Sequence, residues 1–124
     1  MSHRFVWVDI PVHDLDRAIA FYAAVLGTPV SREGGPGFSF GLLAHSGSDV
    51  AGCLYLADDG NAPSPHGPLV YLNVDGRIAA AERAVAAGGG RVLQATQAIG
   101  RHGYRAIVLD SEGNRIALHS ESDR

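Results

Sequence analysis

The sequence has little cysteine, little net charge and no long hydrophobic run. Its single cysteine, Cys53, excludes a disulfide within the chain. A net charge of −3 provides neither the basic surface that nucleic acids and anionic membranes attract nor an acidic tail for a basic partner. Glycine, proline or charged residues interrupt every apolar stretch before the roughly 20 residues that a membrane-spanning helix needs. An apolar N-terminal run with a small-residue cleavage site is also missing, so we expect a cytoplasmic protein that binds neither nucleic acid nor membrane.

The length and composition favour a single domain. A chain of 124 residues that is 46% hydrophobic and 19% charged has enough apolar side chains for one core and little room for a second. We therefore expect one domain over residues 1–124. A domain of this size hides roughly two-thirds of the surface that its unfolded chain exposes, which leaves pairing with a second copy useful.

An internal repeat is the most informative feature of the chain. When the sequence is aligned with itself at an offset of 62 residues, an apolar strand, a helix and the glycine that follows it recur in the same order. The aligned pairs are Val12 with Val74, Ala18 with Ala80, Gly27 with Gly89, Val30 with Val92, Leu54 with Ile116 and Leu56 with Leu118. The chain is therefore predicted to contain two copies of one structural unit.

The first copy predicts a strand, a helix and three further strands. Every second residue from 8 to 12 is aliphatic, which is typical of a strand with one buried face. Asp14 suits an N-cap, apolar residues follow at helical spacing, and Gly27 ends the predicted helix. The strands are predicted at 5–12, 28–32, 38–43 and 51–56, with turns at 34–37 and 45–49.

The second copy repeats this pattern after a linker. Residues 58–68 are rich in Gly, Pro, Asn and Ser, and a helix is predicted over 77–87 with Gly76 in the place of Asp14. Strands are predicted at 69–74, 91–97, 104–109 and 114–119. The fold class is therefore α+β with two tandem βαβββ modules: module one at 4–57, the linker at 58–68 and module two at 69–120.

Two groups of residues resemble a known superfamily. The first comprises Val8-Asp9-Ile10-Pro11-Val12, Asp14, Arg17-Ala18, Phe21-Tyr22 and Leu26-Gly27, and the second Asp110, Glu112-Gly113-Asn114 and Leu118-His119. Together they resemble the vicinal oxygen chelate superfamily of glyoxalases, bleomycin resistance proteins and dioxygenases, and most closely its uncharacterised glyoxalase-related branch. The resemblance implies a curved mixed sheet with helices outside and a cup that binds an oxygen-rich small molecule.

The resemblance also implies where a metal would be held. Metal-dependent members use one residue from the first strand and one from the last strand of each module, and these positions fall on Trp7, Leu69, Tyr55 and Ala117. Three of the four offer no lone pair for a metal, and a tyrosine with an ordinary pKa of about 10 is a poor ligand at neutral pH. We therefore expect no metal and no other cofactor, unless a divalent metal uses donors at other positions.

Alternation along the strands places further residues on the face of these four positions. Asp9 and His119 are candidate catalytic residues, as an acid-base pair or as two ligands of a different metal site. The alternatives are a structurally paired Asp9, a solvated His119, and aromatic residues that serve the core or an interface. The candidate ligand-binding residues are Trp7, Cys53, Tyr55, Leu69, Tyr71, Asn73, Arg101 and Ala117.

Three functions remain compatible with the sequence. The first is a metal-free protein that captures a small organic molecule without transforming it. The second is an enzyme, either a glyoxalase-like lyase or isomerase, or a dioxygenase, that uses other metal donors or the pair Asp9 and His119. The third is a protein-interaction module with a vestigial pocket. We also expect a homodimer, because each half-cup exposes an apolar face, and modules could pair within or between chains.

Overall fold

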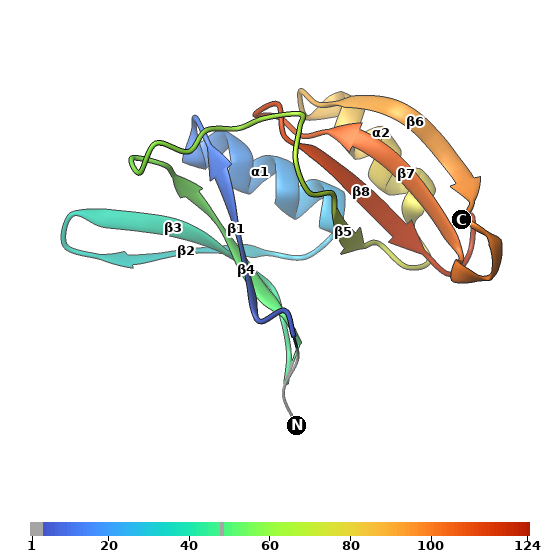
Figure 1. Ribbon diagram of the computed structural model, residues 1–124, viewed down its shortest axis with the longest axis horizontal. Coiled ribbons are helices and arrows are strands. Elements are labelled where there is room, and N and C mark those ends of the chain that lie inside the picture. Colours follow the sequence, from blue (N-terminus) through green and yellow to red (C-terminus); the bar gives the residue numbers. More distant parts are fainter. Residues whose placement is uncertain (1–3, 48) are drawn as a thin grey trace.

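The computed structural model describes residues 4–47 and 49–124, and it shows the predicted βαβββ unit twice (Figure 1). Each module forms its own four-stranded mixed sheet, with strand orders β1-β4-β3-β2 and β5-β8-β7-β6. The elements of module one are β1 (Trp7–Val12), α1 (Leu15–Leu26), β2 (Val30–Gly35), β3 (Phe38–Leu43) and β4 (Ala51–Leu56). Those of module two are β5 (Val70–Asn73), α2 (Ile78–Ala87), β6 (Arg91–Ala98), a 3-10 turn (Gly100–His102), β7 (Tyr104–Leu109) and β8 (Arg115–Ser120). The predicted fold class is confirmed.

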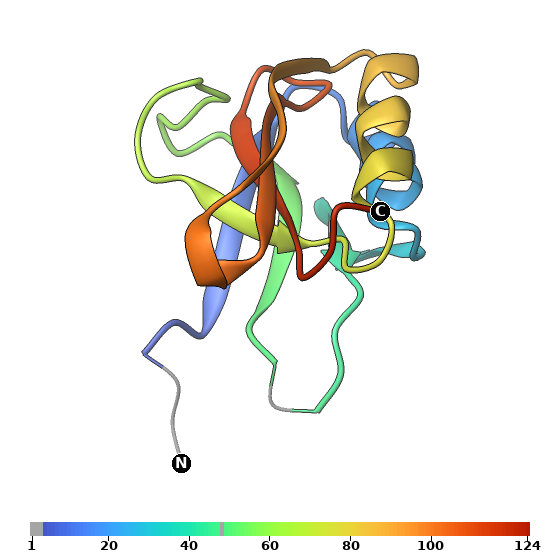
Figure 2. The same ribbon diagram turned by 90° about the vertical axis from the view of Figure 1, so that its right-hand side faces the viewer.

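Both helices lie on the same side of the two sheets, which leaves the opposite faces of the sheets uncovered by helices (Figure 2). The modules contact each other chiefly through α1 and α2. A single cluster of buried apolar residues runs under both helices and through both sheets, and its largest fully buried members are Tyr22, Leu54, Ile78 and Leu118. None of the helices in the described part of the chain is long and apolar enough to cross a membrane.

The two helices begin differently. The Asp14 side chain accepts a hydrogen bond from the Arg17 N–H at 3.0 Å, and Gly27 ends α1 with a φ of 71°, as the sequence predicts. The prediction of Gly76 as the cap of α2 is wrong, because the N-cap is Arg77 and no side chain caps this helix. Gly76 instead forms a left-handed turn with a φ of 75°. The Arg77 guanidinium donates to the carbonyl oxygen of Val25, so it joins the start of α2 to the end of α1.

The strand registers correct the repeat in the last strand of each module. Ile10 pairs with Leu54 in the first sheet, and Leu72 pairs with Leu118 in the second. The first strands thus keep the offset of 62, whereas the last strands are related by an offset of 64. By position in its sheet Ala117 therefore corresponds to Cys53, and the predicted correspondence with Tyr55 is wrong.

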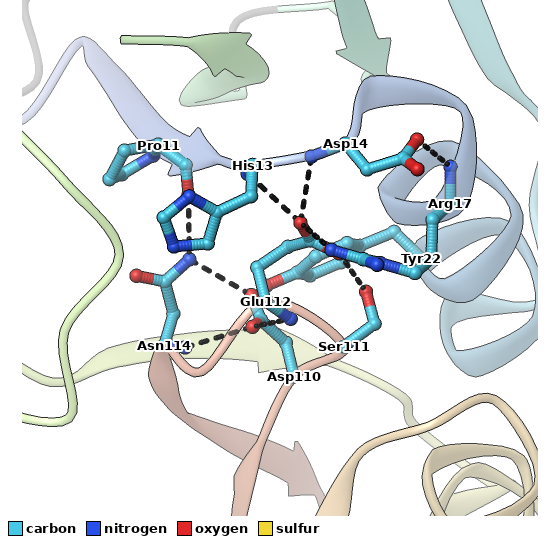
Figure 3. A network of polar contacts seen from close by, with 9 residues as sticks. All are labelled: Pro11, His13, Asp14, Arg17, Tyr22, Asp110, Ser111, Glu112 and Asn114. Atoms are coloured by element: carbon cyan, nitrogen blue, oxygen red, sulfur yellow. Dashed lines mark hydrogen bonds and ion pairs between the residues drawn. The ribbon is translucent and has the colours of Figure 1, made fainter.

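A polar network joins the corner between β1 and α1 to the turn between β7 and β8 (Figure 3). The Glu112 side chain is fully buried and accepts hydrogen bonds from the backbone N–H groups of His13 and Asp14, both at 2.9 Å. Its carboxylate also pairs with the Arg17 guanidinium, with Nε at 2.7 Å and Nη2 at 2.8 Å. Burial by itself raises the pKa of Glu112, but the donors from Arg17, Ser111 and the backbone outweigh it and lower the pKa to about 2.

A second carboxylate completes the network. Asp110 accepts hydrogen bonds from the Tyr22 hydroxyl at 2.5 Å and from the backbone N–H of Asn114 at 2.9 Å. The Asn114 side chain in turn donates to the carbonyl oxygen of Pro11 at 2.8 Å. Burial and the neighbouring Asp110 raise the pKa of Tyr22 well above its usual value, so its hydroxyl remains a donor. This network fixes how the two modules sit relative to each other.

Candidate functional site

The two sheet faces that point away from the helices carry most of the predicted site residues. Side chains alternate between the faces of a strand, and residues paired between strands share a face. Open face A, on the first sheet, comprises Trp7, Asp9, Pro11, Glu33, Phe38, Phe40, Leu42, Cys53 and Tyr55. Open face B, on the second sheet, comprises Tyr71, Asn73, Arg91, Gln97, Arg105, Ile107, Leu109, Arg115, Ala117 and His119.

Open face A has a carboxylate at its centre. One oxygen of Asp9, Oδ1, accepts hydrogen bonds from the Trp7 indole N–H at 2.6 Å and from the Cys53 thiol at 3.3 Å. Within residues 4–47 and 49–124 the other oxygen, Oδ2, takes part in no hydrogen bond. Burial and the Asp9 carboxylate raise the pKa of the Cys53 thiol to about 11, so this thiol is protonated at neutral pH.

A cleft of about 760 Å³ lies beside this carboxylate. Asp9 and Cys53 line it together with three aromatic residues from neighbouring strands, Phe38, Phe40 and Tyr55. The Phe38 ring is 62% exposed and stacks parallel to the Phe40 ring with 6.4 Å between centroids. The Tyr55 hydroxyl accepts a hydrogen bond from the Asn61 side chain in the linker at 3.0 Å, which orients its ring at one end of the cleft. Ser39 and Asp58 also line the cleft, which therefore combines aromatic rings with polar groups, among them the available carboxylate oxygen of Asp9.

Open face B carries positive charge and a cluster of rings. The Arg105 guanidinium donates a hydrogen bond to the Tyr71 hydroxyl, and its Cζ lies 6.0 Å from the centroid of the Tyr71 ring. The His119 ring lies 6.5 Å from the Tyr71 ring. His119 Nε2 donates to the carbonyl oxygen of His102 at 2.6 Å, which leaves Nδ1 as its second polar atom.

The other predicted ligand-binding residues have varied positions. Leu69 is half-buried just before β5, and Arg101 is exposed in the 3-10 turn. The exposed Asn73 side chain accepts from the Asp75 N–H at 2.9 Å, which is a local turn contact. Ala117 is fully buried and presents no surface.

The candidate catalytic residues lie on different sheets. Asp9 is on β1 and contacts Trp7 and Cys53, whereas His119 is on β8 and contacts His102. In the part of the chain that the structure describes, Asp9 and His119 share no hydrogen bond or ion pair. The structure thus joins Asp9 to predicted ligand-binding residues and does not join it to His119.

The donors at the implied metal positions do not fit a metal. The corrected register makes the last-strand pair either Cys53 with Ala117 or Tyr55 with His119, whereas Trp7 and Leu69 in the first strands still offer no lone pair for a metal. Either pair gives at most two donors at the four positions, whereas zinc sites need three or four N, O or S donors. Among the described residues no group of three or more His, Cys, Asp or Glu is placed to hold one metal ion. The expectation of no metal and no cofactor stays a prediction.

Sequence reasoning missed Phe38, Phe40 and Arg105, which contribute rings and charge to the open faces. Phe38 and Phe40 alternate with Ser39 and Gly41 along β3, so the period-two pattern that located Asp9 and Cys53 could have located them. Arg105 follows from the same pattern on β7, but its contact with Tyr71 joins two strands that are not neighbours in sequence.

Comparison with known proteins adds a family to this geometry. A family model described as Glyoxalase/Bleomycin resistance protein/Dioxygenase superfamily matches residues 4–118. No curated protein sequence matches the chain.

Solved structures share the fold at low sequence identity. A glyoxalase/bleomycin resistance protein from Albidiferax ferrireducens has a TM-score of 0.73 and 22% identity, over 95% of this chain and 98% of that one. An antibiotic binding protein from a Streptomyces species has a TM-score of 0.68 and 24% identity, over 97% of this chain and 96% of that one. A glyoxalase-related enzyme from Fulvimarina pelagi has a TM-score of 0.68 and 18% identity, over 96% of this chain and 88% of that one.

Proposed function

The chain belongs to the glyoxalase, bleomycin resistance protein and dioxygenase superfamily, and we propose that it captures a flat organic molecule on open face A without a metal. The observation that carries the proposal is the cleft of about 760 Å³ in which aromatic side chains surround Asp9. Stacking on such rings contributes roughly 0.5 to 1.5 kcal/mol beyond the buried area. The free oxygen of Asp9 would accept a hydrogen bond from an N–H or O–H group of the ligand. The antibiotic binding protein of the same fold is compatible with this function.

Binding without catalysis is favoured over an enzyme by the chemistry of the site. The residues at the implied metal positions supply at most two donors, and the candidate pair Asp9 and His119 is divided between two sheets. A cleft that combines aromatic rings with polar groups is suited to select a ligand by shape and orientation. A cytoplasmic location, where a single cysteine stays reduced, remains part of the proposal.

We further propose a homodimer in which open face A of one chain covers open face B of its partner, and the reverse. Trp7 and Tyr71 are 46% and 45% exposed, and large aromatic residues exposed on sheet faces are typical of surfaces that a partner covers. Charges on the two faces are complementary, since face A carries Asp9 and Glu33 whereas face B carries arginines. Two-fold symmetry would repeat this contact twice and close the cleft. Sedimentation equilibrium tests the assembly directly.

The fluorescence of Trp7, the only tryptophan in the chain, tests the proposed function. Metal-free protein is titrated with a panel of planar aromatic compounds, half of which carry an N–H donor. We expect saturable quenching by members of the panel and an unchanged affinity after chelator treatment. Asp9→Asn should weaken the donor-bearing compounds at least fivefold, which corresponds to about 1 kcal/mol, and should spare the others. Leu93→Ala, which removes an exposed side chain from β6, is the control and should change nothing.

A metal titration tests whether the protein binds a metal. Zinc, nickel, iron and manganese are added singly to dialysed protein while the melting temperature is followed, because a specific ligand raises it by mass action. The proposal expects no rise at metal concentrations that saturate ordinary sites. A stoichiometric metal with a raised melting temperature, or a panel without any saturable binder, would contradict it.

A further inference from the structure

The strands of module two place positive charge on open face B without acidic partners on the same strands. β5, β6, β7 and β8 contain Arg91, Arg105 and Arg115 and no aspartate or glutamate. The register places Arg105 between His119 and Gln97 in one row across the sheet, and places Arg91 and Arg115 on either side of Leu109 in another. Arg105 and Arg115 are therefore separated by about four residues of strand, or roughly 13 Å, and would serve different groups.

Arg105 is held in place by neutral contacts alone. Its Nη1 side donates to the Tyr71 hydroxyl, and the guanidinium lies over the edge of the same ring. Both ion pairs within residues 4–47 and 49–124 involve other arginines, Arg17 and Arg32. Arg105 thus has an oriented charge without a carboxylate.

The Nε–H of Arg105 is the unusual group. Of the buried side-chain nitrogen and oxygen atoms in the described residues, it is the one that has no hydrogen-bond partner. An unpaired buried donor costs about 1 to 3 kcal/mol, and more when the group is charged, so such groups call for a missing partner. Tyr71 occupies the Nη1 side, which leaves the edge of Nε and Nη2 unpaired, and because Nε is buried a ligand would have to displace the groups that cover it. That edge has the spacing of the two oxygens of a carboxylate.

We propose that Arg105 binds the carboxylate group of an organic ligand through this edge, with Tyr71 positioning the guanidinium. His119 is the cross-strand neighbour of Arg105, and its Nδ1 is available for a contact with the same ligand because Nε2 is bonded to His102. Two acidic residues, Asp75 and Glu121, line an adjoining cleft of about 420 Å³ with Tyr71 and His119. The Asp75 carboxylate already accepts from the Glu121 N–H at 2.8 Å and forms no ion pair with Arg105.

This subsite rests on the proposed function and adds to it, because the bound molecule would carry a carboxylate. The subsite lies on a different sheet from the Asp9 cleft. Benzoate and benzamide are the probes, since they have the same shape and only benzoate is an oxyanion. Both are titrated at constant ionic strength into protein labelled with ¹⁵N, and the side-chain N–H resonance of Arg105 Nε is followed. We expect a saturable shift with benzoate and none with benzamide.

Three variants separate a specific site from general attraction to a basic face. Arg105→Gln should weaken benzoate binding at least tenfold, and Arg105→Lys should fall between, because a lysine cannot form two parallel hydrogen bonds. Arg91→Gln removes an equal charge from the same face and should leave the affinity unchanged. Equal losses in Arg105→Gln and Arg91→Gln would overturn the proposal, as would equal binding of benzamide. Tighter binding of inorganic phosphate than of benzoate at Arg105 would overturn the assignment to a carboxylate.

The two proposals fail in distinguishable ways. Quenching of Trp7 by the aromatic panel without an Arg105-dependent benzoate response refutes the carboxylate subsite and leaves binding on open face A standing. The converse result supports the subsite and refutes the function proposed for open face A. Circular dichroism melting curves of each variant confirm that a lost response does not come from a lost fold.

Discussion

Glu112→Gln should destabilise the protein in a manner that depends on pH. The substitution keeps the size of the side chain and removes its charge. One carbonyl oxygen can still accept from the backbone N–H groups of His13 and Asp14, but the new amide N–H₂ faces the Arg17 guanidinium, where the second carboxylate oxygen now lies. The ion pair with Arg17 is thus replaced by two hydrogen-bond donors, the amide N–H₂ and the guanidinium, that face each other.

The magnitude follows from the pKa of Glu112. A carboxyl group whose pKa is lowered from 4.5 to about 2 stabilises the folded state by about 3 kcal/mol when it is ionised in both states. Because the folded pKa lies below the unfolded one, this contribution is complete above pH 4.5 and is lost as the pH falls towards 2. Arg17 is half exposed and regains water when the pair is broken, so we expect a loss of about 2 to 3 kcal/mol at pH 7.

Urea unfolding followed by circular dichroism measures this difference between pH 2 and pH 7. The free energies of unfolding of the wild type and Glu112→Gln should differ most above pH 4.5 and converge at pH 2. Glu33→Gln removes a carboxylate from an exposed strand position and should stay within about 0.5 kcal/mol of the wild type throughout. A difference that is absent at pH 7, or that keeps the same size down to pH 2, would refute the role assigned to the charge.

Two further predictions concern a thiol and a turn. The Cys53 thiol should react with iodoacetamide at pH 8 at least tenfold more slowly than a free cysteine, because its pKa is about 11, and Asp9→Asn should speed the reaction by lowering that pKa. Equal rates in the two proteins would exclude the influence of the carboxylate. Gly27→Ala should lower the free energy of unfolding by more than the 1 to 2 kcal/mol typical of a left-handed residue, because its Cβ would lie 2.9 Å from the end of the Arg77 side chain, which would have to move and give up its hydrogen bond to Val25. Gly76→Ala has a similar φ and open space, so urea unfolding should show the smaller loss there.

Local signals in the sequence account for most of the fold. Asp14 and Gly27 bound α1 as predicted, and the strands at 38–43, 51–56 and 104–109 have the predicted limits. These elements can be predicted from the local sequence, because a cap, a left-handed glycine and an alternating pattern each act over a few residues. The start of α2 is different. Arg77 occupies the cap without a capping side chain, and its guanidinium reaches Val25 on the other helix, a contact that no local pattern reports.

The candidate site was likewise predictable only where a local pattern determines it. Alternation places Asp9 and Cys53 on one face, and the structure shows them in contact. Alternation also places Asp9 and His119 on faces that point away from the helices, and for this reason they were considered as a pair. Whether the open faces of the two sheets come together depends on how the modules pack. That packing is set by α1, α2 and the buried Glu112 network, and no strand pattern reports it.

The offset between the last strands shows why the metal positions were assigned to the wrong pair. Side chains alternate with a period of two, so offsets of 62 and 64 both align aliphatic residues with aliphatic residues: Leu54 meets Ile116 in one case and Leu118 in the other. Only the hydrogen-bond register separates the two. The offset changes because β6 and its connection to β7 are together longer than β2 and its turn, whereas the turn between β7 and β8 is shorter than the connection between β3 and β4. The correction pairs Cys53 with Ala117 and Tyr55 with His119. Either pair leaves the four implied positions with at most two donors, where a zinc site needs three or four.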